Sequence, residues 1–252
     1  MNEPSLSSTK VTGHPVFLHW TFLVHLWTLA GIVFAAVALK AIFEGAMDTG
    51  ARFLLLIPIV DFTDGTLARL LKVKERMPLI SGEIIDYIHD LLGLTFVPMF
   101  FFYKANVFLP EFAFPLVVLA TCAATLKYSM KPNLLSLGYS IGAPPIFLSI
   151  ILFYFLGLPR WSATLYAAAL ILLVMLPIRF PITSMVTTHW KPGWQSITNY
   201  LVFLCAIPVL LWLKDAPKVI YWSLLVNVFI QLTVLPVLLK CGIVKAGFKR
   251  RY

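Results

Sequence analysis

The chain has 252 residues, of which 60% are hydrophobic and only 12% are charged, and its mean hydropathy is +0.89. Soluble domains average roughly 45–50% apolar and about 25% charged residues. A large soluble helical domain is excluded, because too few polar residues remain to cover its surface. The net charge of +9 would suit nucleic acid, but the positions of the charges indicate a different origin.

Apolar segments long enough to cross a bilayer core of about 30 Å recur along the whole chain. The polar first dozen residues are followed by an apolar stretch that we interpret as a membrane anchor, not as a cleavable signal peptide. Eight spans are predicted, in chain order at residues 18–42, 53–72, 82–103, 111–128, 137–157, 162–179, 197–214 and 218–240. Short connections predict one membrane-embedded domain over residues 1–252, an all-α polytopic bundle whose helices at about 197–240 are additions to the core.

The basic residues orient this eight-span arrangement. Most of the 20 Lys and Arg residues fall on the side that holds both termini and the loop at 72–76. Because basic residues accumulate on the cytoplasmic side of membrane proteins, both termini are predicted to be cytoplasmic. The basic tail at 245–252 is expected to contact anionic lipid. The positive charge therefore indicates topology, and no nucleic-acid partner is expected.

The stretch most informative about chemistry is residues 61–90, which hold six of the 11 acidic residues. Asp61, Asp64, Gly65 and Ala68 stand at i, i+3, i+4 and i+7, a spacing that places them on one face of a helix.

Gly82, Asp86 and Asp90 follow with a spacing of four, again on one helical face. The short loop between the two helices makes them antiparallel neighbours whose ends meet at the membrane interface. Four aspartates, two from each helix, are therefore predicted to converge at one site.

Such a cluster needs a physical reason, because an acid within a membrane helix is unfavourable and four anions repel one another. A bound divalent cation, or two, removes the repulsion. Oxygen ligands alone favour Mg²⁺ or Mn²⁺ over zinc. Gly65 and Gly82 indicate close approach of a nucleotide or of the partner helix. Each acid taken singly is more simply a solvated charge at a helix end, whereas the joint pattern favours a metal site.

These residues resemble the signature of the CDP-alcohol phosphotransferase family. The match covers about thirty residues and includes every fixed position of the motif: Asp61, Asp64, Gly65, Ala68, Arg69, Gly82, Asp86 and Asp90. Twelve residues separate Arg69 from Gly82, a longer gap than most of the family has. The gap and the number of spans resemble the bacterial phosphatidylcholine synthase branch, which condenses CDP-diacylglycerol with choline and releases CMP.

The resemblance implies a role for each motif residue. Asp61, Asp64 and Asp86 would hold two Mn²⁺ or Mg²⁺ ions, and Asp90 would be the general base that also touches metal. The residues implied in binding the CDP moiety are Asp61, Asp64, Gly65, Ala68, Arg69 and Gly82. Among these, Gly65 and Ala68 would make room for cytidine, and Arg69 would neutralise phosphate charge.

Two further groups of residues are candidates for substrate contacts. Choline is a quaternary ammonium that binds aromatic faces beside an anion, for which Phe62, Tyr87 and Glu83 are candidates. Lys127 and Lys131 are candidates for the lipid phosphate, because members of the resembled family often use basic residues there. Interfacial aromatic belts and cytoplasmic topology explain the same residues without a substrate.

The resemblance also implies a bacterial inner membrane, an active site at its cytoplasmic face, contacts with membrane lipids and a homodimer. Another acceptor alcohol, such as serine, inositol or glycerol phosphate, is the alternative within the family. An ion-coupled transporter is the alternative outside it. Transporter sites usually lie near the bilayer midplane between internal repeats, whereas these acids flank one turn and no repeat is visible.

Overall fold

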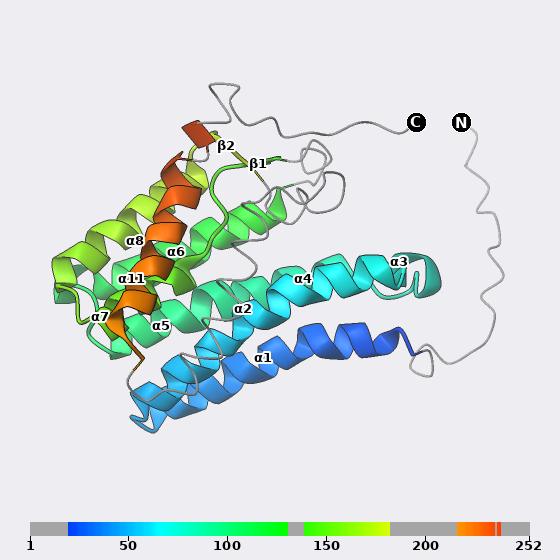
Figure 1. Ribbon diagram of the computed structural model, residues 1–252, viewed down its shortest axis with the longest axis horizontal. Helices are drawn as coiled ribbons and strands as arrows, with labels where there is room; N and C mark the ends of the chain where they lie inside the picture. The colour runs from blue at the N-terminus through cyan, green and yellow to red at the C-terminus, as the bar shows by residue number, and fades with distance from the viewer. Residues whose placement is uncertain (1–19, 131–138, 182–215, 235, 238–252) are drawn as a thin grey trace.

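The computed structural model describes residues 20–130, 139–181, 216–234 and 236–237 (Figure 1). These residues are mostly helical. The elements, in chain order, are α1 (Phe22–Phe43), α2 (Met47–Leu70), α3 (Val73–Arg76), α4 (Gly82–Asp90), the π-helix η2 (Leu91–Phe96), α5 (Val97–Lys104), α6 (Pro110–Ser129), β1 (Tyr139–Ile141), the 3₁₀-helix η4 (Phe147–Ile150), α7 (Ile151–Leu156), α8 (Arg160–Met175), β2 (Arg179–Pro181), α11 (Lys218–Phe229) and the π-helix η5 (Ile230–Val234).

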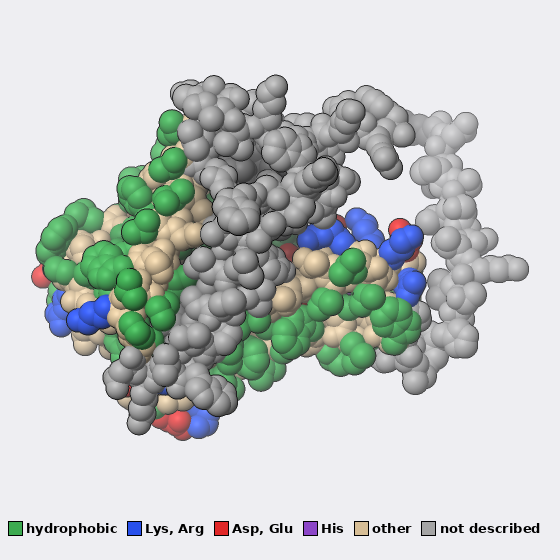
Figure 2. Space-filling model, in the orientation of Figure 1, with side chains coloured by type: hydrophobic (Ala, Val, Ile, Leu, Met, Phe, Trp, Pro, Cys, Tyr) green, Lys and Arg blue, Asp and Glu red, His purple; other side chains and the backbone are tan. Residues whose placement is uncertain are grey.

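Three helices in the described part of the chain are long and apolar enough to cross a membrane: α1, α6, and the continuous helix Gly82–Lys104 that α4, η2 and α5 form together. The 22 residues of α1 extend about 33 Å, close to the thickness of a bilayer core. Large hydrophobic side chains on these helices face outward, including Leu23, Val33 and Phe114. Figure 2 shows hydrophobic side chains between charged groups at opposite ends of the molecule. This exterior is compatible with a helical membrane protein.

One predicted span is wrong in its first half. Residues 137–157 were expected to form a single helix, but the helical segment begins only at Phe147. Gly142 adopts a φ of +77°, and Pro144 and Pro145 have no N–H to donate, so a helix cannot run through this stretch.

Two short strands, β1 and β2, accompany the helices of this mostly helical structure. They pair antiparallel with Ser140 opposite Phe180. The strand β2 follows α8, which ends at Met175, so the predicted span at 162–179 is shorter than expected. The predicted span at 197–214 lies outside the described residues, while α11 and η5 occupy most of the predicted span at 218–240.

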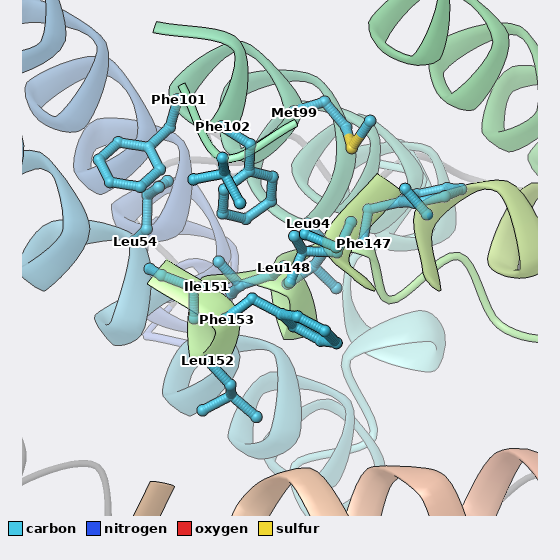
Figure 3. Packing of buried hydrophobic residues seen from close by; sticks show 14 of the residues in the cluster. Leu54, Leu94, Met99, Phe101, Phe102, Phe147, Leu148, Ile151, Leu152 and Phe153 are labelled. Carbon is cyan, nitrogen blue, oxygen red and sulfur yellow. The ribbon is translucent and has the colours of Figure 1, made fainter. Parts of the chain in front are cut away.

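The main core packs α2 against the long helix Gly82–Lys104, whose α5 part also packs against α7. Leu54 of α2 and the α5 rings of Phe101 and Phe102 are all buried in it, together with Ile151 of α7 (Figure 3). Phe101 also meets the ring of Tyr154 edge-on, with 5.1 Å between centroids. This packing determines how the end of α2 lies relative to α4.

The turn between α2 and α4 is held by a second, smaller core. Val73 of α3 and Met77 pack against Val24 of α1. The side chain of Ser81 then caps α4 by accepting a hydrogen bond from the N–H of Ile84 at 3.4 Å, which satisfies a helix-end donor. With α1 packed against both α2 and α4, the chain reverses direction and brings the acidic ends of α2 and α4 toward each other.

Candidate metal centre

The acidic side chains of α2 and α4 meet in one cluster. Asp61 from α2 and Asp86, His89 and Asp90 from α4 each offer one ligand atom, and these four atoms all lie within 4.8 Å of one another. The three aspartates are half-buried, and His89 is fully buried. The structure therefore brings together three of the four aspartates that the helical spacing predicted to converge, and it adds a histidine.

Asp64, the fourth aspartate, lies just outside this group. Its side chain is buried, and its Oδ1 accepts the backbone N–H of Gly65. Thr28 of α1 lies near the Asp64 carboxylate, and Asp61 and Asp86 are its electrostatic neighbours. Asp64 borders the cluster from α2 and adds to its negative charge.

Several buried polar atoms in and beside the cluster have no hydrogen-bond partner among the described residues. They are Oδ2 of Asp64, Oδ1 of Asp90 and both ring nitrogens of His89. Buried polar atoms are nearly always hydrogen-bonded, and carboxylates this close repel one another. A divalent cation would neutralise the repulsion and accept lone pairs from the carboxylate oxygens and from one nitrogen of His89. The residues present therefore fit a metal ion.

Two motif residues, Arg69 and Gly65, lie next to each other at the end of α2. A Cβ added to Gly65 would lie 3.3 Å from Nη1 of Arg69, so the guanidinium folds back over the glycine. Nη2 of Arg69 also donates to Oγ1 of Thr66 at 3.4 Å. Asp86 is an electrostatic neighbour of Arg69. The absent side chain of Gly65 thus lets a positive charge lie beside the acidic cluster.

The other two small residues of the motif contact protein. A Cβ on Gly82 would lie 3.2 Å from Cε1 of His25 in α1, so Gly82 allows a neighbouring helix to approach closely. Ala68 packs against the small core of Val24, Val73 and Met77. Of the two reasons given above for Gly82, the structure shows the approach of a partner helix.

The residues predicted to contact choline are spread around α4. The ring of Tyr87 stacks on that of Tyr128 from α6, with 5.7 Å between centroids and 29° between planes. Tyr128 is an electrostatic neighbour of Asp90. Glu83 points to an exposed ion pair with Lys74 at 3.2 Å, and Phe62 is half-buried beside Asp61 in the chain.

Of the two lysines predicted to bind lipid phosphate, Lys127 lies among the described residues. Nζ of Lys127 donates a hydrogen bond to the carbonyl oxygen of Gly142 at 3.0 Å, which ties α6 to the segment after β1. Lys131 lies outside the described residues.

Sequence reasoning alone did not assign His89 or Tyr128 to the site. His89 stands three residues after Asp86, so its helical position carried a signal, although a packed histidine was the simpler interpretation. Tyr128 gave no local signal, since it reaches Asp90 from α6, far along the chain. Only the packing of α6 against η2, which continues α4, brings it there.

Several curated proteins that are similar to this chain in sequence carry one name. A phosphatidylcholine synthase of Borreliella burgdorferi is 26% identical over 166 residues, which cover 66% of this chain and 70% of the relative. That of Pseudomonas aeruginosa is 33% identical over 154 residues, or 59% of this chain and 64% of the relative. That of Brucella melitensis is 27% identical over 199 residues, which cover 78% of this chain and 71% of the relative.

No protein-family model matches the chain. The matched regions span between 64% and 71% of the three relatives' own length. Three proteins from different bacteria nevertheless carry the same name, and each match covers more than half of this chain. The chain is therefore similar in sequence to bacterial phosphatidylcholine synthases.

Proposed function

We propose that the chain is a phosphatidylcholine synthase, which transfers the phosphatidyl group of CDP-diacylglycerol to choline and releases CMP. The observation that carries the proposal is the cluster of Asp61, Asp86, His89 and Asp90, whose ligand atoms lie within 4.8 Å of one another. Similarity to proteins of that name from several bacteria supports the choice of substrates.

The proposed reaction is a displacement at the phosphorus that carries diacylglycerol. The choline hydroxyl oxygen forms a bond to this phosphorus, and its proton passes to the carboxylate of Asp90 as general base. The bond from the same phosphorus to the oxygen shared with CMP breaks, and CMP leaves with the electron pair. Two bound divalent cations, Mn²⁺ or Mg²⁺, would polarise the phosphates and stabilise the charge on the leaving group. Asp61, Asp64 and Asp86 are the residues we propose to hold them, with Asp90 also in contact with metal.

The cytidine diphosphate is proposed to lie along the end of α2. Arg69 lies beside the acidic cluster, where its charge would offset that of the phosphates. Gly65 and Ala68 have small side chains that would leave room for the nucleotide at this turn, and both are half-buried. Gly82 would contribute by setting the distance of α4 from α1.

Choline is proposed to bind against the stacked rings of Tyr87 and Tyr128. A quaternary ammonium gains about 0.5–2 kcal/mol over an aromatic face. Asp90 is an electrostatic neighbour of Tyr128, so choline bound at the two rings would have its hydroxyl near the proposed base. Phe62 and Glu83 remain candidates for the edge of this pocket, although Glu83 already pairs with Lys74.

The proposal includes a place in the cell. The distribution of basic residues supports an inner membrane protein with about eight spans and cytoplasmic termini. The acidic cluster would then lie at the cytoplasmic face, where soluble choline and CMP meet a substrate held in the lipid. We also propose a homodimer.

The test of this function is CMP release by detergent-purified protein supplied with CDP-diacylglycerol, Mn²⁺ and one alcohol at a time. Product with choline alone supports the proposal. Product with serine, inositol or glycerol phosphate instead of choline would show that the enzyme uses a different acceptor alcohol. If folded protein that binds metal releases no CMP with any alcohol, the chain is not a phosphotransferase, and the ion-coupled transporter becomes the favoured alternative.

A further inference from the structure

His89 is a buried histidine whose ring nitrogens find no protein partner. Its side chain is 0% exposed, and neither Nδ1 nor Nε2 has a hydrogen-bond partner among the described residues. A buried polar group without a hydrogen-bond partner destabilises the folded state. A histidine placed here only for packing would therefore be worse than an apolar side chain of the same size, and this requires another explanation.

The ring of His89 occupies space that a glycine of α1 leaves open. A Cβ on Gly31 would overlap the Nε2 and Cδ2 atoms of the ring. The Nε2 edge therefore points toward α1. The other nitrogen, Nδ1, lies 3.4 Å from Oδ1 of Asp90 and so faces the acidic cluster.

The spacing of these atoms is that of ligands around one small cation. Ligand atoms about 2.1 Å from a metal lie about 3 Å apart when adjacent and about 4.2 Å apart when opposite. The distance of 3.4 Å between Nδ1 of His89 and Oδ1 of Asp90 is close to the adjacent value. The four ligand atoms of Asp61, Asp86, His89 and Asp90 lie within 4.8 Å, slightly wider than the opposite value. Asp64 is not among the four.

We propose that Nδ1 of His89 is a direct ligand of one of the two divalent cations, alongside the carboxylates of Asp61, Asp86 and Asp90. The proposal rests on the proposed function only in requiring that the cluster binds a metal. It gives the centre a nitrogen ligand that the aspartate motif does not contain. Imidazole favours transition metals, whereas a site built of oxygen alone also suits Mg²⁺. The protein should therefore bind Mn²⁺ more tightly than Mg²⁺, and removal of the imidazole should shrink this difference.

The test is pulsed electron paramagnetic resonance of Mn²⁺ bound to the full-length protein in detergent. Two samples are compared, one at natural abundance and one with ¹⁵N-labelled histidine. A hyperfine coupling that changes with the histidine isotope shows a histidine nitrogen bound to the metal. This comparison uses the wild-type chain, so it does not depend on any variant folding correctly.

Two variants then identify the histidine. His89→Gln should remove the isotope-sensitive coupling and weaken Mn²⁺ binding by at least about 10-fold, since even residues that only orient a ligand are worth about 10–100-fold. His25→Gln is the matched control, because His25 is also a buried histidine with an unpartnered Nε2 but lies outside the cluster. The control should keep the coupling.

Three outcomes overturn the assignment: bound Mn²⁺ with no histidine coupling, a coupling that survives His89→Gln, or no Mn²⁺ binding at all. The proposed function is judged separately by CMP release. If CMP is formed but no histidine coupling appears, the synthase stands and the ligand assignment fails. If neither CMP nor bound Mn²⁺ is found, both fail.

Discussion

Nε1 of Trp27 in α1 donates a hydrogen bond of 2.7 Å to Oγ1 of Thr63 in α2. Thr63 lies between Asp61 and Asp64 in the chain, so the contact ties α1 to the turn of α2 that carries these acids. Oγ1 of Thr63 in turn lies 2.7 Å from the carbonyl oxygen of Ile59. The position of α2 beside the cluster is therefore held by a polar contact as well as by apolar packing.

Trp27→Phe should lower the free energy of unfolding by about 0.5–1.5 kcal/mol, the usual net value of a neutral hydrogen bond. Thr63→Val should cost a similar amount. Because both variants remove the same bond, the double variant should be less destabilised than the sum of the two. Unfolding in mixed micelles measures all three, and fully additive losses would show that the bond contributes nothing.

Asp90→Asn should lower kcat by about 10²–10⁴-fold, the usual contribution of a general base. Asparagine keeps the shape and one carbonyl oxygen but cannot accept the proton. Mn²⁺ should still bind, more weakly, through the remaining residues. Steady-state CMP release and Mn²⁺ titration measure the two effects, and an unchanged kcat would remove Asp90 as the base.

Removal of metal should destabilise the protein, because the carboxylates then repel one another without compensation. Free Mn²⁺ at 100 times its dissociation constant should stabilise the fold by about 2.7 kcal/mol.

Asp86→Asn should have the opposite effect on the metal-free protein. Without metal it should be more stable than the wild type by about 1 kcal/mol or more, since one of the facing charges is gone. Thermal unfolding with Mn²⁺ and with EDTA measures both, and equal stability of the metal-free proteins would contradict the repulsion.

Tyr128→Leu should raise the KM for choline several-fold, because it removes an aromatic face that we propose to contact the ammonium. Tyr128→Phe keeps the face and loses only the hydroxyl, so its KM should stay near that of the wild type. Any loss in Tyr128→Phe should appear in kcat, through the lost contact with Asp90. Equal KM values for Tyr128→Phe and Tyr128→Leu would show that the ring of Tyr128 does not contact choline.

Gly142→Ala should destabilise the fold strongly. Gly142 has a φ of +77°, and a Cβ there would overlap the backbone carbonyl of Val174. Gly157→Ala is the matched control, since Gly157 has a φ of +64° with nothing within 4 Å of an added Cβ. The control should cost only the strain of a left-handed residue, about 1–2 kcal/mol, so the difference between the two variants reports the overlap. Equal losses would show that backbone strain alone acts at both positions.

The helical spacing of the acids was a sufficient guide to the convergence of Asp61, Asp86 and Asp90. A period of 3.6 residues places residues three or four apart on one face, and a short turn returns the next helix alongside. These are local properties, so they can be derived without the fold. The same reasoning predicted a helix through Gly142 and was wrong there, because hydropathy does not register the prolines and the left-handed glycine that end it.

The sequence by itself determined that this is an apolar helical chain with an acidic site on two successive helices. Composition and periodicity suffice for that, since they act within one segment at a time. The tertiary structure decided which groups complete the site. His89 faces the cluster because Gly31 of α1 leaves room for its ring, and Tyr128 lies near Asp90 because α6 packs against η2, the continuation of α4. Such contacts join residues distant in the chain, so the pattern around either residue alone cannot reveal them.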